Sequence, residues 1–314
     1  MELRQLEYFM EVCKELNFTR ASENLNVSQP SLSQQIKSLE AELETPLFDR
    51  IGKKIAITEA GNILLTHCYR VFHELDQVEA ALNDLNGLMR GELSVGTILT
   101  EEMTLLPSII MKFKQLYPSI KLSVEGLRTE DIRDKLLENE LDLGIVFLPI
   151  ETEEFETIPL FTDTLSLVVP QTHPLAEEKE VEFKQLDHRD MILFPEDFYI
   201  RRIIDESSEK MGVTLRPVLE MTTIESITEM AAQGLGAVLL PSTYVDSIQK
   251  AELKQVKLKN PVLNMTIGVA YRKDKFVCAA TKAFISLLKE RSRVLCKQSR
   301  GSRAVVTDMT FKPS

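Results

Sequence analysis

The residues best suited to recognition chemistry lie on a helix predicted from Gln29 to about Glu44. One side of this helix carries an apolar stripe made of Leu32, Ile36, Leu39 and Leu43. The other side carries hydroxyls, amides and one ammonium group, which can hydrogen-bond to base edges or phosphates in a DNA major groove. On an isolated helix such a face is more often solvated surface. The neighbouring segments therefore determine whether it is more consistent with DNA recognition. The face comprises Ser28, Gln29, Pro30, Ser31, Ser33, Gln34 and Lys37.

Groups that could converge for catalysis are scattered. The four histidines are His67, His73, His173 and His188, and no G-x-S-x-G, phosphate loop or zinc-ligand spacing occurs. The segment Gly234-Leu235-Gly236 follows a predicted helix and precedes a strand, the reverse of a dinucleotide fingerprint. We therefore predict a protein that is not an enzyme and that has no metal site and no cofactor.

Two shorter helices must hold the polar face in position. The first is predicted from Leu3 to about Leu16, and the second over Arg20–Leu25 with Thr19 as its N-cap. Ser28 suits the N-cap of the third helix, and Pro30 suits its first turn, where a missing N–H costs nothing.

A basic hairpin is predicted directly after these helices. Pro46 should stop the third helix, and 47–58 should form two short strands with Gly52 at the turn. A hairpin in this place is a wing, whose cations would meet the DNA backbone or the minor groove. The basic residues expected on the DNA surface are Arg20, Arg50, Lys53 and Lys54.

The N-terminal 60 residues resemble the DNA-binding domain of LysR-type transcriptional regulators almost position by position. The matching segments are Leu6–Phe9, Asn17–Ser22, Val27–Glu40, Pro46–Arg50 and Thr58–Gly61. The resemblance implies a winged helix-turn-helix over 1–58, a promoter-DNA partner with two-fold symmetry, and a sequence-specific regulator of transcription. The net charge of −11 neither supports nor excludes this partner, because distant charges are screened.

A long helix over 59–89 is predicted to be a linker and coiled coil. Its apolar residues recur in alternating steps of four and three, which is the a/d seam of a dimer. The alternative is that this seam packs on its own domain. The residues expected to hold two copies together are Leu64, Val71, Leu75, Val78, Leu82 and Leu85.

From 90 to 290, short apolar strands alternate with helices, one of them predicted over Glu102–Leu116. This alternation predicts an α/β domain with parallel sheets. The resemblance implies a two-lobed, periplasmic-binding-protein-like effector domain, with lobe I formed by 90–163 and 265–290 and lobe II by 164–264. The basic tail 291–314 is expected to be disordered.

An effector should bind between the lobes, at strand ends and helix N-termini. Each candidate could instead be a helix cap or half of a surface ion pair. The candidates are Thr97, Thr100, Arg128, Thr129, Phe147, Phe194, Pro195, Arg201 and Thr222. The arginines and helix termini favour a small anionic metabolite, although Glu101 and Glu102 weigh against an anion.

The remaining expectations concern location and assembly. No signal peptide or membrane span is apparent, and the four cysteines form no C-x-x-C pair, so we expect a cytoplasmic protein with reduced thiols. A solute-binding transport component is the alternative that the two-lobed half suggests by itself. The resemblance implies dimers that pair into a tetramer, an effector that shifts this pairing, and contact with RNA polymerase.

Overall fold

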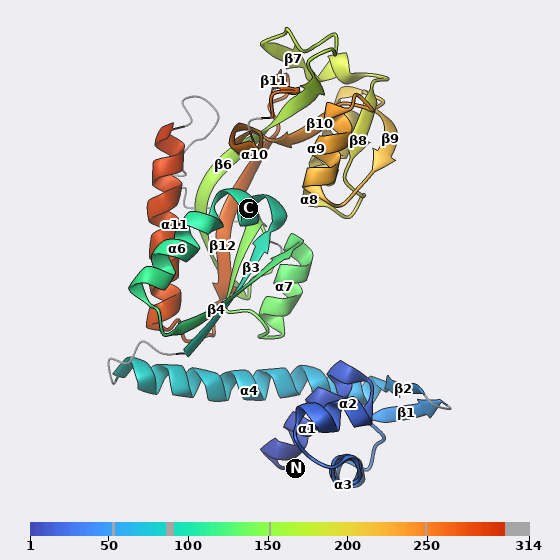
Figure 1. The fold of residues 1–314 in the computed structure, drawn as a ribbon, viewed down its shortest axis with the longest axis vertical. Coiled ribbons are helices and arrows are strands. Elements are labelled where there is room, and N and C mark those ends of the chain that lie inside the picture. Colours follow the sequence, from blue (N-terminus) through green and yellow to red (C-terminus); the bar gives the residue numbers. More distant parts are fainter. Residues whose placement is uncertain (52–53, 86–90, 151, 249, 299–314) are drawn as a thin grey trace. The chain divides into compact units, whose positions relative to one another are not determined.

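A computed structural model describes residues 1–51, 54–85, 91–150, 152–248 and 250–298 (Figure 1). The chain divides into two compact units, and the first comprises Met1–Leu82. Its helices α1, α2 and α3 pack on one another around an apolar core. The elements of this unit are α1 (Leu3–Glu15), α2 (Phe18–Asn24), α3 (Gln29–Glu42), β1 (Phe48–Ile51), β2 (Lys54–Ile57) and α4 (Glu59–Leu85).

Local chemistry corrects two details of the predicted helices. Asn17, not Thr19, caps α2, because its Oδ1 accepts hydrogen bonds from the N–H groups of Thr19 and Arg20 at 2.9 and 3.2 Å. Helix α3 ends at Glu42, before Pro46 could stop it, and Glu44 turns the chain with a left-handed φ of 49°.

Gly61 allows α4 to start close against the wing. A Cβ at this position would lie 2.4 Å from the carbonyl oxygen of Leu47, inside any permitted contact distance. The hydroxyl of Thr58 bridges the same junction, since it donates to the carbonyl of Pro46 at 2.8 Å and accepts from the Gly61 N–H at 3.0 Å. The start of α4 therefore packs directly against the backbone that leads into the wing, and the Thr58 hydroxyl bonds to both segments.

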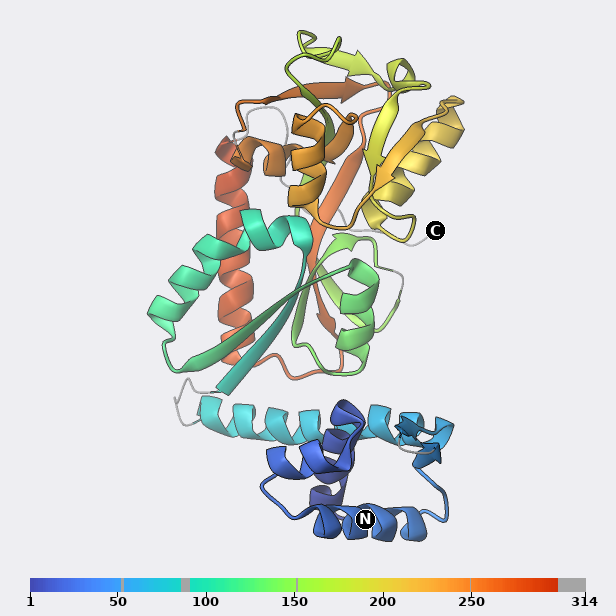
Figure 2. The same cartoon turned by 45° about the vertical axis from the view of Figure 1, so that its right-hand side comes forward.

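The second unit consists of two lobes joined by long strands (Figure 2). The elements of lobe I are β3 (Gly91–Ile98), α5 (Leu99–Thr104), α6 (Leu106–Leu116), β4 (Ile120–Leu127), α7 (Thr129–Leu137), β5 (Leu143–Leu148), β12 (Asn264–Arg272), α11 (Ala279–Gln298) and the first part of β6 (Phe155–Pro170). Strand β3 pairs in parallel with β4 and β5, while β12 is antiparallel to β5 and β6. The sheet is therefore mixed, not purely parallel as predicted.

Lobe II is built around the second part of β6, from Leu165 onward. There β6 exchanges β12 for two other antiparallel partners, β10 and β11, so the chain changes lobes at Thr164–Leu165. The elements of lobe II are β7 (Glu180–Glu182), a 3-10 helix (Phe183–Leu186), β8 (Asp190–Leu193), α8 (Tyr199–Met211), β9 (Arg216–Glu220), α9 (Ile224–Ala232), β10 (Val238–Pro241), α10 (Ser242–Ile248) and β11 (Leu253–Lys259).

The structure departs from the sequence predictions at three places in this unit. The helix predicted over Glu102–Leu116 is two helices, α5 and α6, which meet at Leu105, just before Pro107 in the first turn of α6. Strands β7 and β11 and helix α10 were not predicted. The tail expected to be disordered from 291 continues α11 as far as Gln298, and 299–314 lie outside the described residues.

Candidate functional sites

The polar face of α3 is presented to solvent by burial of its apolar stripe. Leu32, Ile36 and Leu39 are at most 1% exposed, whereas Leu43, the fourth residue of the predicted stripe, follows the end of α3 and is 37% exposed. The N-cap Ser28 accepts a hydrogen bond from the Ser31 N–H at 3.3 Å and so defines where the helix begins. Ser33 is half-buried, and the exposed residues of the predicted face are Ser28, Gln29, Pro30, Ser31, Gln34 and Lys37.

Two side chains that the sequence analysis missed hold α3 against its neighbours. Glu40 accepts hydrogen bonds from the N–H groups of Leu47 and Phe48, at 2.9 and 3.3 Å, and so ties the start of the wing to α3. Gln5 of α1 donates to the side-chain oxygen of Gln35 at 3.3 Å. Neither contact has a periodic signal in the sequence, because each joins a single side chain to a partner in another element.

The basic residues predicted around α3 are only partly described. Strands β1 and β2 pair antiparallel, with Arg50 opposite Ile55 and Ile51 opposite Lys54. Lys53 lies outside the described residues, as do the side chains of Arg50 and Lys54. The guanidinium of Arg20 is exposed and contacts Glu15, donating to its carbonyl at 3.1 Å and lying 3.4 Å from its carboxylate.

The apolar seam of α4 divides into two parts. Near the start of the helix, Cys68 is fully buried and Leu64 is half-buried against the core of the first unit. Further along, the seam is exposed to between 39% and 58%, and its residues there are Val71, Leu75, Val78 and Leu82. The side chain of Leu85 is not described. Packing on its own domain thus accounts for the first part of the seam only.

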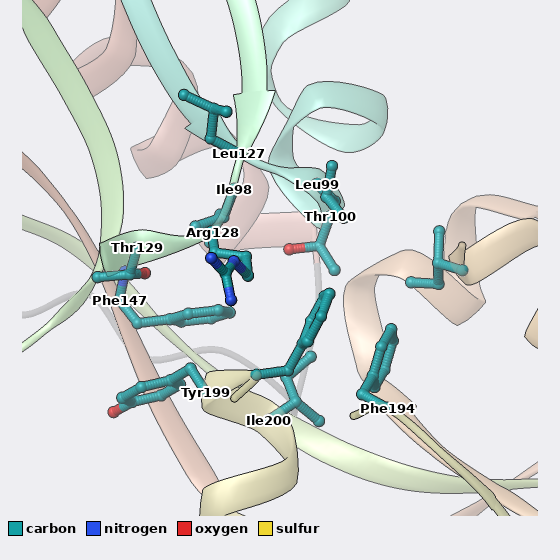
Figure 3. A pocket seen from close by; sticks show the side chains of 12 residues that line it. Ile98, Leu99, Thr100, Leu127, Arg128, Thr129, Phe147, Phe194, Tyr199 and Ile200 are labelled. Carbon is teal, nitrogen blue, oxygen red and sulfur yellow. The ribbon is translucent and has the colours of Figure 1, made fainter. Parts of the chain in front are cut away.

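A pocket lies between the two lobes of the second unit (Figure 3). Five of the predicted effector residues line it: Thr100, Arg128, Thr129, Phe147 and Phe194. Pro195 and Thr222 line an open groove beside it, which shares Leu99, Leu127, Arg128 and Phe198 with the pocket. The volume of the pocket is only about 40 Å³, enough for a few waters at most. A larger ligand therefore requires the lobes to separate or the side chains to move.

Two aromatic side chains of lobe II are among the pocket residues that the sequence analysis missed. The ring of Tyr199 stacks on Phe147 with centroids 4.5 Å apart, and its hydroxyl donates to the carbonyl of Leu148 at 3.3 Å. Phe198 stacks on Phe194 at 5.3 Å. The other residues missed are Ile98, Leu99, Leu127, Ile200 and Ile224. Apolar residues at element ends look like ordinary core in a sequence.

Two of the predicted effector residues lie away from the pocket lining. Thr97 is fully buried, and its hydroxyl donates to the carbonyl of Ile98 at 3.2 Å. The side chain of Arg201 is 8% exposed, and its guanidinium donates to Asp205, to Glu220 at 2.7 Å and to the carbonyl of Phe194 at 2.8 Å. Arg201 therefore joins three segments of lobe II and does not line the pocket or the groove.

Two of the polar candidates that line the pocket, Thr129 and Arg128, also have partners within the protein. Thr129 accepts a hydrogen bond from the N–H of Phe147 at 3.3 Å. Arg128 is held by Asp131 and by Asp197, and its guanidinium lowers the pKa of Asp131 below the usual value. In Figure 3 the guanidinium of Arg128 lies next to the ring of Phe147, among the side chains that line the pocket.

Buried thiols lie in the core of the first unit. Burial raises the pKa of Cys13 to about 12, with a further contribution from Cys68, and burial raises the pKa of Cys68 to about 11. Within the described ranges, no three histidine, cysteine or acidic side chains are grouped as metal ligands. A search of the same ranges finds no helix with the length and apolarity needed to cross a membrane.

Two family models account for most of the chain. A model described as the bacterial regulatory helix-turn-helix protein, lysR family, matches residues 3–62. A model described as the LysR substrate binding domain matches residues 86–293. The first match covers the three helices, the wing and the start of α4 in the first unit, which is named the DNA-binding unit below, and the second match covers most of the two-lobed unit.

Curated relatives resemble the chain over nearly its whole length. An uncharacterized HTH-type transcriptional regulator, YwbI of Bacillus subtilis, is 29% identical, with 96% of this chain and all of that protein covered. A probable RuBisCO transcriptional regulator of Phaeodactylum tricornutum is 31% identical, with 92% of this chain and 96% of that protein covered. Both are named as regulators of transcription and not as enzymes.

Solved structures support the same arrangement of elements. A full-length OxyR variant from Pseudomonas aeruginosa is 27% identical and has a TM-score of 0.74, with 100% of this chain and 99% of that chain covered. Full-length CbnR in complex with its target DNA is 21% identical, with a TM-score of 0.70 over 93% of this chain and 100% of that chain. At 21% identity, the second likeness concerns the fold alone.

Proposed function

This chain belongs to the LysR family of transcriptional regulators, and on that premise we propose how its surfaces divide the work. The exposed face of α3 enters the major groove of promoter DNA, and the wing contacts the backbone beside it. The exposed seam of α4 pairs two copies. The pocket between the lobes takes a small anionic effector. The observation that carries this proposal is the exposed polar face of α3 opposite the buried side chains of Leu32, Ile36 and Leu39.

Assembly of two copies follows from the geometry of DNA recognition. One helix-turn-helix reads only a few base pairs, so a pair of recognition helices spaced by one helical turn supplies specificity. Val71, Leu75, Val78 and Leu82 form an exposed apolar row suited to a coiled coil. We propose that these dimers pair again into a tetramer, that the effector shifts this pairing, and that the bound protein contacts RNA polymerase in the cytoplasm.

A gel-shift with DNA from upstream of the protein's own gene tests the proposal. Sequence-selective retardation that weakens steeply with salt supports it. The double variant L75E/V78E should dissociate the dimer and weaken promoter binding by about a hundredfold, because two linked half-sites bind more tightly than one. Glu74→Gln changes a neighbouring exposed residue of α4 and should leave both properties unchanged. A monomeric wild-type protein that ignores promoter fragments at moderate salt would overturn the assignment.

A further inference from the structure

Arg128 binds two carboxylates in two different ways. Its Nε and Nη2 atoms donate to the two oxygens of Asp131, both at 2.7 Å, which is the bidentate arrangement that a guanidinium favours. The remaining nitrogen, Nη1, donates to the carboxylate of Asp197. Two nitrogens of the guanidinium therefore bind Asp131 in a bidentate manner, and Nη1 binds a single carboxylate oxygen of Asp197.

The two carboxylates also differ in what they are attached to. Asp131 lies three residues beyond Arg128, on α7 of the same lobe. Asp197 belongs to lobe II, in the loop between β8 and α8, and is 69 residues away in sequence. Any separation of the lobes removes Asp197 from Arg128 but leaves Asp131 in place. Asp197 is the exchangeable partner.

The Nη1 atom of Arg128 lies where a ligand could reach it. Arg128 lines both the pocket and the open groove beside it, whereas Asp197 lines only the groove. The groove has about 450 Å³ of space, and Phe198, Leu99 and Leu127 give it and the pocket a shared apolar wall. Side-chain exposures of 35% for Arg128 and 56% for Asp197 leave this ion pair open to solvent and to competition.

We propose that Asp197 is a built-in occupant of a carboxylate site on Arg128, and that the effector is a carboxylate with an apolar body that takes its place. This inference rests on the proposed function, since it names the chemistry of the effector for the same pocket. Binding exchanges one carboxylate for another at Nη1, so no charge on Arg128 is left unpaired. The exchange also breaks a contact between the lobes, which gives the effector a means to alter their closure.

Removal of the built-in occupant should strengthen binding of a free carboxylate. We would titrate full-length wild-type protein and the Asp197→Ala variant with sodium phenylacetate, and with phenylacetamide as a neutral molecule of similar shape, by calorimetry without DNA. The solvent-exposed carboxylate of Asp197 competes only weakly with a free carboxylate for Arg128. The Asp197→Ala variant should therefore bind phenylacetate about fivefold more tightly than wild type. Phenylacetamide should show no gain. Replacement of Arg128 by Met should remove the preference for phenylacetate.

Glu130→Gln is the matched control. Glu130 of lobe I forms a second ion pair between the lobes, with Arg202 of lobe II, and this pair does not occupy Nη1 of Arg128. A gain in phenylacetate affinity restricted to Asp197→Ala supports the inference. An equal gain in Glu130→Gln, an equal gain for phenylacetamide, or no phenylacetate binding by Asp197→Ala overturns it. Failure of promoter binding in the gel-shift would instead overturn the proposed function and leave this titration unaffected.

Discussion

Polar side chains that were predicted to bind a partner are exposed in the DNA-binding unit, but in the two-lobed unit several of them are bound to other side chains. On α3, Gln34 and Lys37 are exposed, as a reading face requires. In the two-lobed unit, Arg128 and Arg201 are already bound to carboxylates of the protein itself. A helix face is set by the spacing of residues a few positions apart, whereas a pocket is set by which distant segments meet. A charged side chain near the pocket therefore has to give up a partner within the chain before it can bind a ligand.

The largest effect on stability is expected when a buried residue beneath the polar face of α3 is replaced. Leu32→Ala removes a fully buried side chain from the core of the DNA-binding unit and should destabilise that unit by about 3 kcal/mol. Chemical denaturation followed by circular dichroism measures this. The control is Leu116→Ala, because Leu116 lies at the end of α6 and its side chain is 55% exposed. This variant should change the free energy of unfolding by less than about 0.5 kcal/mol. A loss for Leu32→Ala as small as that expected for Leu116→Ala would mean that the fold of this unit does not depend on the buried side chains of α3.

Arg201 tests the opposite side of the comparison. Arg201→Met should destabilise the two-lobed unit by about 2 kcal/mol, because it leaves Asp205, Glu220 and the Phe194 carbonyl without their shared donor. The value is below that for a fully buried pair, since the two carboxylates are about half exposed. Arg216→Met, whose side chain is 67% exposed, should leave the melting temperature unchanged. If the Arg201→Met variant is as stable as wild type, the ion pairs of Arg201 do not stabilise the fold, and Arg201 could instead bind the effector.

Gln34 tests whether exposure on α3 serves recognition. Gln34→Ala should weaken binding to the preferred promoter sequence by about tenfold and relax base preference at one position, because an amide can bond to a base edge. Its stability should equal that of wild type, since the side chain is exposed. Quantitative gel-shifts on a panel of single-base variants measure this. Lys14→Ala, exposed on α1 outside the predicted face, is the control. A uniform loss across all sequences would contradict the assignment.

The buried thiols predict a smaller, pH-dependent effect in the DNA-binding unit. Cys13 and Cys68 have folded-state pKa values of about 12 and about 11, against a usual value of 9.0. Between pH 9 and 11 the unfolded chain therefore loses protons that the folded chain keeps. The stability that these thiols contribute is complete below pH 9 and falls above it, by up to about 1.4 kcal/mol per pH unit per thiol.

Urea unfolding of the DNA-binding unit at pH 8.5, 9.5 and 10.5 measures this slope. The C13A/C68A double variant should show a shallower decline than wild type, because the remaining lysines and tyrosines titrate in both proteins alike. The two thiols should also resist labelling at pH 8 until the chain unfolds, since they are buried and protonated. Parallel pH profiles for wild type and double variant would argue against this account.

The smallest effect concerns the turn after α3. Glu44 adopts a φ of 49°, a conformation that costs a residue with a side chain about 1 kcal/mol and costs glycine nothing. Glu44→Gly should stabilise the DNA-binding unit by about 0.5 kcal/mol, after the greater freedom of glycine in the unfolded chain is subtracted. Ser38→Gly, within α3, should instead destabilise it by about 0.5 kcal/mol. Thermal melting distinguishes the two signs.

The sequence by itself determined the helices of the DNA-binding unit and the exposed face of α3. Both depend on a stripe with a period of 3.6 residues, and the partners in such a stripe lie within one or two turns of each other. The family, the two-lobed architecture and five of the residues that line the pocket were also predicted, the lobes through resemblance and the five residues from their places at strand and helix ends.

Tertiary structure decided which residues were free to act. Three contacts join segments that are far apart in sequence. They are the antiparallel pairing of β12 with β5, the stacking of Tyr199 on Phe147, and the ion pair between Arg128 and Asp197. The division of the α4 seam into a buried start and an exposed remainder likewise depends on how far the core of the DNA-binding unit extends along the helix. Such pairings leave no periodic signal, because one contact between two distant residues has no repeat.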